Sequence, residues 1–201
     1  VMFSQKVSEE SITEIVNTKK LYPVTKDEKI LVVFPLIKVV TLVEDENNNL
    51  MSLCDFMDIP TDRHYMSIDP TEEEQNELIE LAKQYDKVVY CSYNACFNKT
   101  QADLINSLEK DKLAVIAIRT PYDINVLDVE TYLCSYEASV QAFIALAKVL
   151  TNQITATGNV SNLYIKNSVM KSTAKQIGSV AGISYGTIST VYSDAYIVSE
   201  Q

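Results

Sequence analysis

Three segments decide the fold of this chain: KVVYCSYNA at residues 87–95, LAVIAIRTPYD at 113–123 and TYLCSYE at 131–137. Each is a short run of β-branched and aromatic residues that stops at polar residues. A helical pattern separates the first two segments, and another follows the third. This order predicts parallel strands joined by crossover connections, and in such a sheet ligands and partners are expected at the carboxyl ends of the strands.

Further patterns extend the sheet toward the amino terminus. ILVVF at 30–34 is a continuous apolar run, as expected for a strand covered on both faces, and HYMSI at 64–68 is a shorter strand candidate. The apolar run at 36–43 fits either a sixth strand or a tightly packed loop. Helical spacing predicts helices over residues 4–18, 50–58, 70–85, 98–108 and 140–150. The expected fold class is α/β: a three-layer, doubly wound, mostly parallel sheet of five or six strands.

Three helix starts are predicted from local polar residues. Ser8 precedes two glutamates and is a candidate N-cap, and Asp69 followed by Pro70 is a stronger one because proline suits the first helical position. Asn98 and Gln101 have the spacing of a capping box. Each of these side chains is therefore expected to accept or donate hydrogen bonds within the first turn of its own helix.

Composition limits the classes of function. The 201 residues are 47% hydrophobic, enough for one domain with its own core plus an appendage. The formal net charge of −10 disfavours nucleic acid and other polyanions as general partners, because the field of the whole protein repels phosphates.

The four cysteines are expected to be buried free thiols, since Cys91 and Cys96 have neither a CxxC nor a zinc-site spacing. No signal peptide or membrane anchor is expected in this chain, which begins at Val1, so its localisation is left open between the cytoplasm and the cell envelope. The four glycines all lie at or beyond Gly158. No glycine-rich phosphate loop can therefore follow a strand, and no cofactor or metal is expected.

The three strand segments also resemble a known family. Residues 92–95 (SYNA), 117–123 (AIRTPYD) and 132–136 (YLCSY) resemble, in that order, motifs of the C-terminal α/β domain of glycoside hydrolase family 3, in its bacterial β-N-acetylhexosaminidase branch. ESIT at 10–13 with LYPV at 21–24, and ATGN at 156–159, resemble the family's opening and closing motifs. The resemblance spans roughly residues 5–160.

The resemblance implies an accessory role in the metabolism of carbohydrates or cell-wall glycans. In such enzymes catalysis belongs to an N-terminal (β/α)8 barrel, which supplies an Asp nucleophile and a His-Asp acid/base. None of that barrel is in this chain, so the chain is expected to be inactive alone, with the barrel as its partner and an amino-sugar glycan as a candidate ligand. His64, the one histidine, is expected to be structural.

Four residues follow the strand ends where function is expected: Asn94, Arg119, Tyr122 and Asp123. The resemblance implies that they complete a glycan pocket or face the barrel. The simpler interpretation is that Arg119 and Asp123 pair with each other and close their loop. Glu130 and Glu137 are the nearest other carboxylates, and neither fits a catalytic pattern of the family. No catalytic residue is assigned.

The sequence divides into residues 1–158, the α/β domain, and residues 159–201, a helical tail. Gly178, Gly182 and the apolar residues around them have the spacing of a helix-turn-helix. The candidate reading segment at 184–192 contains no Arg, Lys, Asn or Gln, so DNA binding is disfavoured. The alternative function is a non-catalytic module in which the α/β body senses a ligand and the tail reports it.

Overall fold

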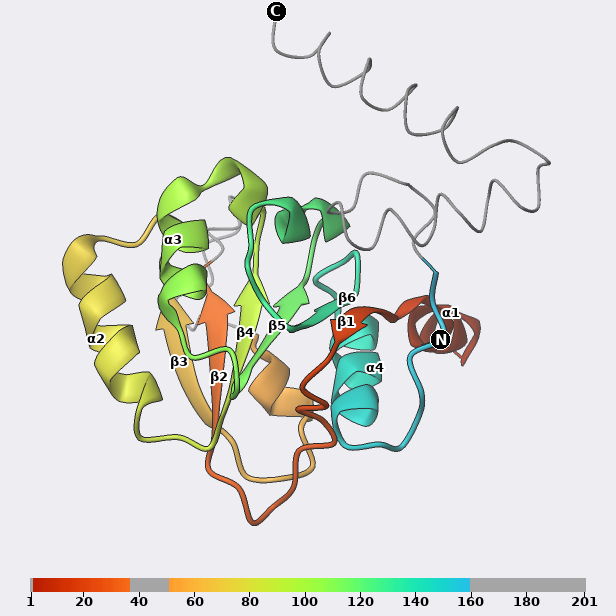
Figure 1. Ribbon diagram of the computed structural model, residues 1–201. Coiled ribbons are helices and arrows are strands. Elements are labelled where there is room, and N and C mark those ends of the chain that lie inside the picture. Colours follow the sequence, from red (N-terminus) through yellow and green to blue (C-terminus); the bar gives the residue numbers. More distant parts are fainter. Residues whose placement is uncertain (1, 37–50, 160–201) are drawn as a thin grey trace, which may run out of the picture. The chain divides into compact units, whose positions relative to one another are not determined.

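The computed structural model describes residues 2–36 and 51–159, which form an α/β domain (Figure 1). The predicted helical tail at 159–201, apart from its first residue, and the run at 37–43 lie outside these residues. The helices are α1 (Met2–Ser11), α2 (Glu72–Ala82), α3 (Lys99–Ser107) and α4 (Val140–Leu150), with 3-10 turns η1 (Leu53–Phe56), η2 (Ala95–Phe97) and η3 (Pro121–Asn125). The strands are β1 (Thr13–Asn17), β2 (Ile30–Pro35), β3 (Asp62–Met66), β4 (Lys87–Ser92), β5 (Leu113–Ala117) and β6 (Thr131–Cys134).

The strands form one six-stranded sheet in the order β1-β6-β5-β4-β2-β3. All neighbouring pairs are parallel except β1 with β6. Numbered along the chain, the five parallel strands run 2-1-3-4-5 across the sheet, so the order reverses between β2 and β4. The prediction of a mostly parallel α/β sheet is confirmed. At the β6 edge, the antiparallel strand β1 completes the sheet.

The prediction of one helix over residues 4–18 is wrong. The helix ends at Ser11, and Thr13–Asn17 is β1, which pairs with β6 from Thr13 opposite Cys134 to Asn17 opposite Thr131. Ile12, Ile15 and Val16 share one face of a helix, but β-branched side chains are also the residues that favour strands. These residues form a strand rather than a helix because the backbone groups at the edge of β6 would otherwise be unpaired.

All three predicted helix starts differ from the structure in detail. Thr71, rather than Asp69, is the N-cap of α2, and it forms a capping box with Glu74: Thr71 Oγ1 accepts from the Glu74 N–H at 3.3 Å and Glu74 accepts from the Thr71 N–H at 2.7 Å. Asn98 occupies the N-cap position of α3 without a side-chain cap bond. Ser8 lies inside α1, where its hydroxyl donates to Glu137 at 3.3 Å.

The core lies on both faces of the sheet, between two helical layers. In Figure 1, α2 and α3 cover one face while α4 and η1 cover the other. Alternate residues of the central strands, such as Val32 and Phe34, pack against α4, where Phe143 is fully buried. The Phe143 ring meets Phe34 edge-on, with ring centroids 5.3 Å apart, and Phe56 of η1 lies 6.1 Å away. These aromatic contacts fix η1 and α4 to the sheet.

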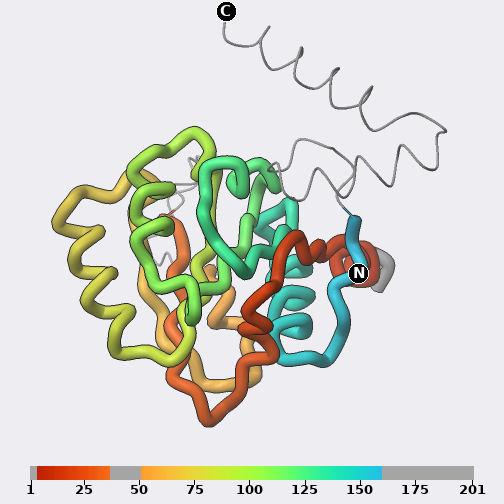
Figure 2. Tube along the Cα trace, in the orientation of Figure 1, coloured from red at the N-terminus to blue at the C-terminus, as the bar shows by residue number. Residues whose placement is uncertain are grey.

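The first and last described segments meet beside α4 (Figure 2). The N–H of Gly158 donates to the carbonyl oxygen of Ile12 at 2.9 Å, directly before β1. Helix α1 is tied to α4 by Glu9, which accepts from Lys148 at 2.5 Å; this hydrogen bond is the main cause of the lowered pKa of Glu9. We refer to the contact between Ile12 and Gly158 as the clasp.

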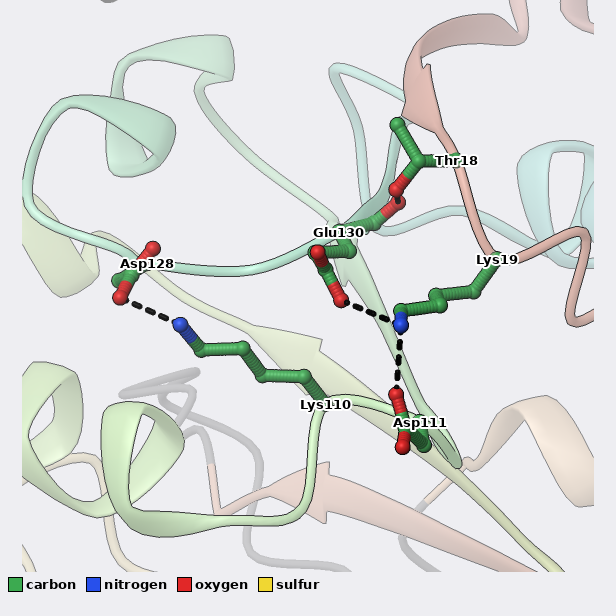
Figure 3. A network of polar contacts seen from close by, with 6 residues as sticks. All are labelled: Thr18, Lys19, Lys110, Asp111, Asp128 and Glu130. Atoms are coloured by element: carbon green, nitrogen blue, oxygen red, sulfur yellow. Dashed lines mark hydrogen bonds and ion pairs between the residues drawn. The ribbon is translucent and has the colours of Figure 1, made fainter.

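Charged side chains at the amino ends of β5 and β6 are paired with one another (Figure 3). Lys19 Nζ lies 2.8 Å from Asp111 and 3.3 Å from Glu130, and Lys110 pairs with Asp128. The hydrogen bond with Asp111 is the first cause of the raised pKa of Lys19, and it lowers the pKa of Asp111. Lys19 thereby connects the end of β1 to the loops before β5 and β6, and the pair of Lys110 with Asp128 connects these two loops to each other.

The cysteines are all free thiols, as predicted, with Cys91 and Cys134 buried and Cys54 and Cys96 half-buried. Over the two described ranges, no helix has the length and apolar character needed to cross a bilayer.

Candidate functional site

The loops that follow β4 and β5 form one edge of the sheet, uppermost in Figure 1. Backbone pairing continues past the ends of these strands: the N–H of Ile118 donates to Ser92 O at 3.1 Å, and the N–H of Ser135 donates to Ala117 O at 3.0 Å. The four predicted residues Asn94, Arg119, Tyr122 and Asp123 all lie in the two loops. We call this part of the molecule the carboxyl edge.

Asp123 is fully buried and holds the two loops together. Its Oδ2 accepts from the Ser92 hydroxyl at 2.8 Å, and its Oδ1 accepts from the Cys96 N–H at 3.0 Å. One carboxylate in η3 thereby fixes both the end of β4 and the turn η2. A buried carboxylate needs such partners, because an unpaired one would lose its hydration without compensation.

Cys96 also contacts this carboxylate through its thiol. Burial, followed by the hydrogen bond to Asp123, raises the pKa of Cys96 to about 11, so the thiol stays protonated at neutral pH. Sequence reasoning identified Asp123 but missed Ser92 and Cys96. The three are separated by up to 31 residues, and no local pattern marks them as partners.

Gln101 performs a similar task on the other side of β4. Predicted to cap α3, it is instead 1% exposed and bonds to the backbone of two loops. Its Oε1 accepts from the Tyr93 N–H at 2.9 Å, and its Nε2 donates to Ile68 O at 3.1 Å and to Tyr93 O at 3.2 Å. The amide therefore links the loop that follows β3 to the loop that follows β4, two strands that β2 separates in the sheet.

Arg119 does not pair with Asp123, which corrects the simpler interpretation of the sequence. Its guanidinium lies over the ring of Tyr93, 5.8 Å from the centroid, and the side chain is exposed. Within residues 2–36 and 51–159, no carboxylate forms an ion pair with Arg119. A guanidinium stacked on an aromatic ring keeps its N–H donors at the rim, where they can reach another molecule.

Asn94 and Phe97 form the outer part of the carboxyl edge. Asn94 is in the left-handed region (φ 51°, ψ 42°), which asparagine tolerates better than most residues. Its carbonyl oxygen accepts from the Phe97 N–H at 3.0 Å and from Asn98 Nδ2 at 2.8 Å. The tight turn projects Phe97 outward with 83% of its surface exposed. Phe97 could not be predicted from the sequence, because no local pattern reveals that one aromatic residue is exposed.

Tyr122 is half-buried in η3, and its N–H donates to Thr120 Oγ1 at 3.3 Å. The neighbouring residue Pro121 accepts, through its carbonyl oxygen, a 3.2 Å hydrogen bond from the hydroxyl of the buried Tyr132. Burial raises the pKa of Tyr132 well above the ordinary value for tyrosine. η3 is therefore fixed by the hydrogen bond from Tyr132 to Pro121 as well as by the hydrogen bonds that Asp123 accepts.

The remaining titratable candidates lie away from this edge or are already engaged. Glu130 pairs with Lys19 at the opposite edge of the sheet, and Glu137 accepts from Ser8 and from Ser139 at 3.0 Å. His64 is on the outer strand β3, and burial lowers its pKa. No group of three or more His, Cys, Asp or Glu side chains with metal-binding geometry occurs among the described residues.

The carboxyl edge therefore presents a single buried carboxylate with both oxygens bonded, together with an exposed aromatic ring, an exposed guanidinium and an amide. Glycoside hydrolysis with retention uses two carboxyl groups about 5–5.5 Å apart across the scissile bond. The edge also carries hydrogen-bonding and apolar groups on its outer side, and the loops that bear them are fixed from within by Asp123 and Gln101.

Several solved structures share this fold. A glycoside hydrolase family 3 β-N-acetylglucosaminidase from Paenibacillus sp. str. FPU-7 is 34% identical, with a TM-score of 0.69 over 77% of this chain and 31% of that one. A fungal multi-domain family 3 β-N-acetylglucosaminidase, which has a GCN5-related glucosamine N-acetyltransferase region, is 19% identical (TM-score 0.62, 83% of this chain and 19% of that one). A β-glucosidase from Listeria innocua in complex with isofagomine is 14% identical (TM-score 0.58, 75% and 25%).

The second and third of these likenesses concern the fold alone, whereas the first extends to the sequence. In each case this chain spans less than a third of the other protein's length. No protein-family model and no curated protein sequence matches the chain. The α/β domain of this chain is thus related in sequence and fold to a glycoside hydrolase family 3 enzyme, and it matches one part of that enzyme's chain.

Proposed function

We propose that this chain supplies the accessory, C-terminal α/β domain of a bacterial β-N-acetylhexosaminidase-like glycoside hydrolase and is inactive without a catalytic barrel. The observation that carries the proposal is the 34% identity to the Paenibacillus β-N-acetylglucosaminidase over 77% of this chain. The substrate class is N-acetylglucosamine-containing glycan, by analogy with the activity of that enzyme.

The chemistry of the carboxyl edge supports the accessory role. Asp123, its buried carboxylate, already accepts hydrogen bonds from Ser92 and Cys96. A nucleophile must face the substrate, and a general acid must be able to give up a proton within reach of the leaving oxygen. Asp123 is turned inward and does neither. The two groups required for hydrolysis are therefore expected from another part of the enzyme.

A complementation assay tests this proposal. The remainder of the Paenibacillus enzyme, produced without the region that matches this chain, is mixed with the full 201-residue chain, and hydrolysis of p-nitrophenyl N-acetylglucosaminide is followed. We expect no hydrolysis by the chain alone, and a higher rate or longer thermal half-life of the remainder in the mixture. The control is heat-denatured chain at the same concentration.

Two results would overturn the proposal. One is hydrolysis by the chain alone at a rate typical of enzymes, about 1 per second or faster. The other is a mixture that behaves as the remainder does by itself, provided circular dichroism shows that both components are folded.

A further inference from the structure

Phe97 is exposed on a turn that the protein holds rigidly. Its ring is 83% exposed, more than any other large apolar side chain that the structure describes. Yet the turn η2 is fixed by the bond from the Cys96 N–H to Asp123, by the bond from the Phe97 N–H to Asn94, and by the bond from the Asn98 side chain to the same carbonyl oxygen. The exposure of the ring is thus built into the fold.

Arg119 supplies a second, independent feature on the same edge. The protein carries a formal net charge of −10, and many of its cations are paired with nearby carboxylates, as Lys19 and Lys148 are. The other arginine, Arg63, bonds to Asp55 at 2.7 Å. Arg119 instead rests on the ring of Tyr93. Its donors are available to an acidic group that the described part of the chain does not provide.

The shape of the surface favours a protein rather than a sugar. Small-ligand sites are concave and enclose most of the ligand. Phe97, with 83% of its surface exposed, instead protrudes from the domain. Protruding aromatic residues and arginines are the side chains that most often anchor protein interfaces, where they enter a pocket on the partner.

We infer that Phe97 and Arg119 anchor the docking of this domain onto a second folded domain, which offers an apolar socket to Phe97 and a carboxylate to Arg119. The inference rests on the proposed accessory function and deepens it by naming the contact. Asp123 and Gln101 act behind this surface as positioning residues, since they fix the turn and the strand end that carry the two anchors. The partner is a protein domain in the remainder of the enzyme. This chain matches 31% of the Paenibacillus enzyme, so most of that enzyme lies outside the matched part.

Calorimetric titration of the full chain into the remainder of the Paenibacillus enzyme tests the inference. We expect Phe97→Ala to raise the Kd about tenfold or more, as for an interface anchor. Arg119→Gln should weaken binding by a smaller factor, and Arg119→Glu should weaken it more than Arg119→Gln because like charges then face each other. The matched control is Val7→Ala, a 50% exposed apolar residue of α1, outside the two loops that form the carboxyl edge.

The outcomes separate the inference from the proposed function. If the wild-type chain binds and Phe97→Ala binds equally well, the inference fails while the proposed function stands. If the wild-type chain does not bind and its fusion in place of the matching region gives an inactive enzyme, both fail. The fusion also provides a second readout, since Phe97→Ala should lower its thermal stability but leave that of the isolated chain unchanged.

Other occupants of the surface are distinguished by the same variants. Saturable binding of N-acetylglucosamine oligomers that Phe97→Ala abolishes would make the surface a glycan site. A dimer of the chain that Phe97→Ala dissociates would make it a contact between copies. If replacing Glu44, Asp45 and Glu46 by Gln removes the effect of Arg119→Gln, the carboxylate belongs to this chain. Each of these results overturns the inference.

Discussion

Replacing Asp123 by Ala should destabilise the domain more than any exposed carboxylate substitution. The carboxylate is 0% exposed, and it accepts from Ser92 at 2.8 Å and from Cys96 at 3.0 Å. A hydrogen bond to a charged group contributes about 1.5–3 kcal/mol, and the loss of both leaves a buried hydroxyl and a buried N–H unpaired. We expect the free energy of unfolding to fall by about 3–5 kcal/mol.

A conservative variant separates geometry from charge. Asp123→Asn keeps the size of the side chain, its amide oxygen can still accept one hydrogen bond, and its amino group can donate to Ser92. Its cost should be about 1–2 kcal/mol. The control is Asp103→Ala, because Asp103 is half-exposed and bonds only to the exposed Lys99, so its change should stay within about 0.5 kcal/mol.

Urea unfolding followed by circular dichroism measures these free energies on the full chain. Ser92→Ala and the double variant with Asp123→Ala complete a mutant cycle, whose coupling energy should be about 1–3 kcal/mol because the two side chains are in direct contact. A loss below about 1 kcal/mol for Asp123→Ala, or a coupling energy near zero, would refute the view that this carboxylate holds the two loops together.

Four further outcomes are expected. Gln101→Ala should destabilise the domain by about 2–4 kcal/mol in urea unfolding, since it leaves three backbone groups of the half-buried residues Tyr93 and Ile68 without their side-chain partner. Gly158→Ala should lower Tm, because an added Cβ would lie 2.2 Å from the backbone oxygen of Ser11, next to the clasp; an unchanged Tm would contradict this close packing. Lys19→Ala should lower Tm slightly at low salt and not measurably in about 1 M NaCl, because salt screens exposed ion pairs. Burial is the first cause that raises the pKa of Cys96 to about 11 and that of Cys134 to about 12, so the unfolded chain loses these protons first as the pH rises. Stability should be complete below about pH 9 and decline between about pH 9 and 12, measured by urea midpoints; a midpoint that rises over this range would be the contrary result.

The parallel core of the fold could be predicted from the sequence because its signals are local. The strand segments at 87–95 and 113–123 are apolar runs of the right length, and each ends at the polar residues that begin the next loop. The antiparallel strand β1 could not be predicted in this way. Ile15 and Val16 have a spacing that fits a helix or a strand, and only the unpaired edge of β6, more than a hundred residues away, selects the strand.

The location of the candidate site could be predicted from the sequence, but the contacts that its residues make could not. The rule that function lies at the carboxyl ends of parallel strands located Asn94, Arg119 and Asp123 correctly on one edge. Their partners are decided by tertiary packing. Gln101 has the spacing of a capping residue and yet serves two distant loops, and Arg119 has a carboxylate four residues away and yet stacks on Tyr93. Local spacing describes what a side chain can do, whereas burial selects which bond it makes.

The clasp has a consequence for how such a domain can be combined with others. Because the N–H of Gly158 reaches the carbonyl oxygen of Ile12, the start of β1 and the last described segment are a single hydrogen bond apart. A host polypeptide could therefore be interrupted at one surface loop, receive the segment from β1 to Gly158, and resume with almost no displacement of its own backbone. The same proximity would allow the termini to be joined and new ones opened elsewhere, so the order of segments along the gene is free to change while the three layers stay as they are.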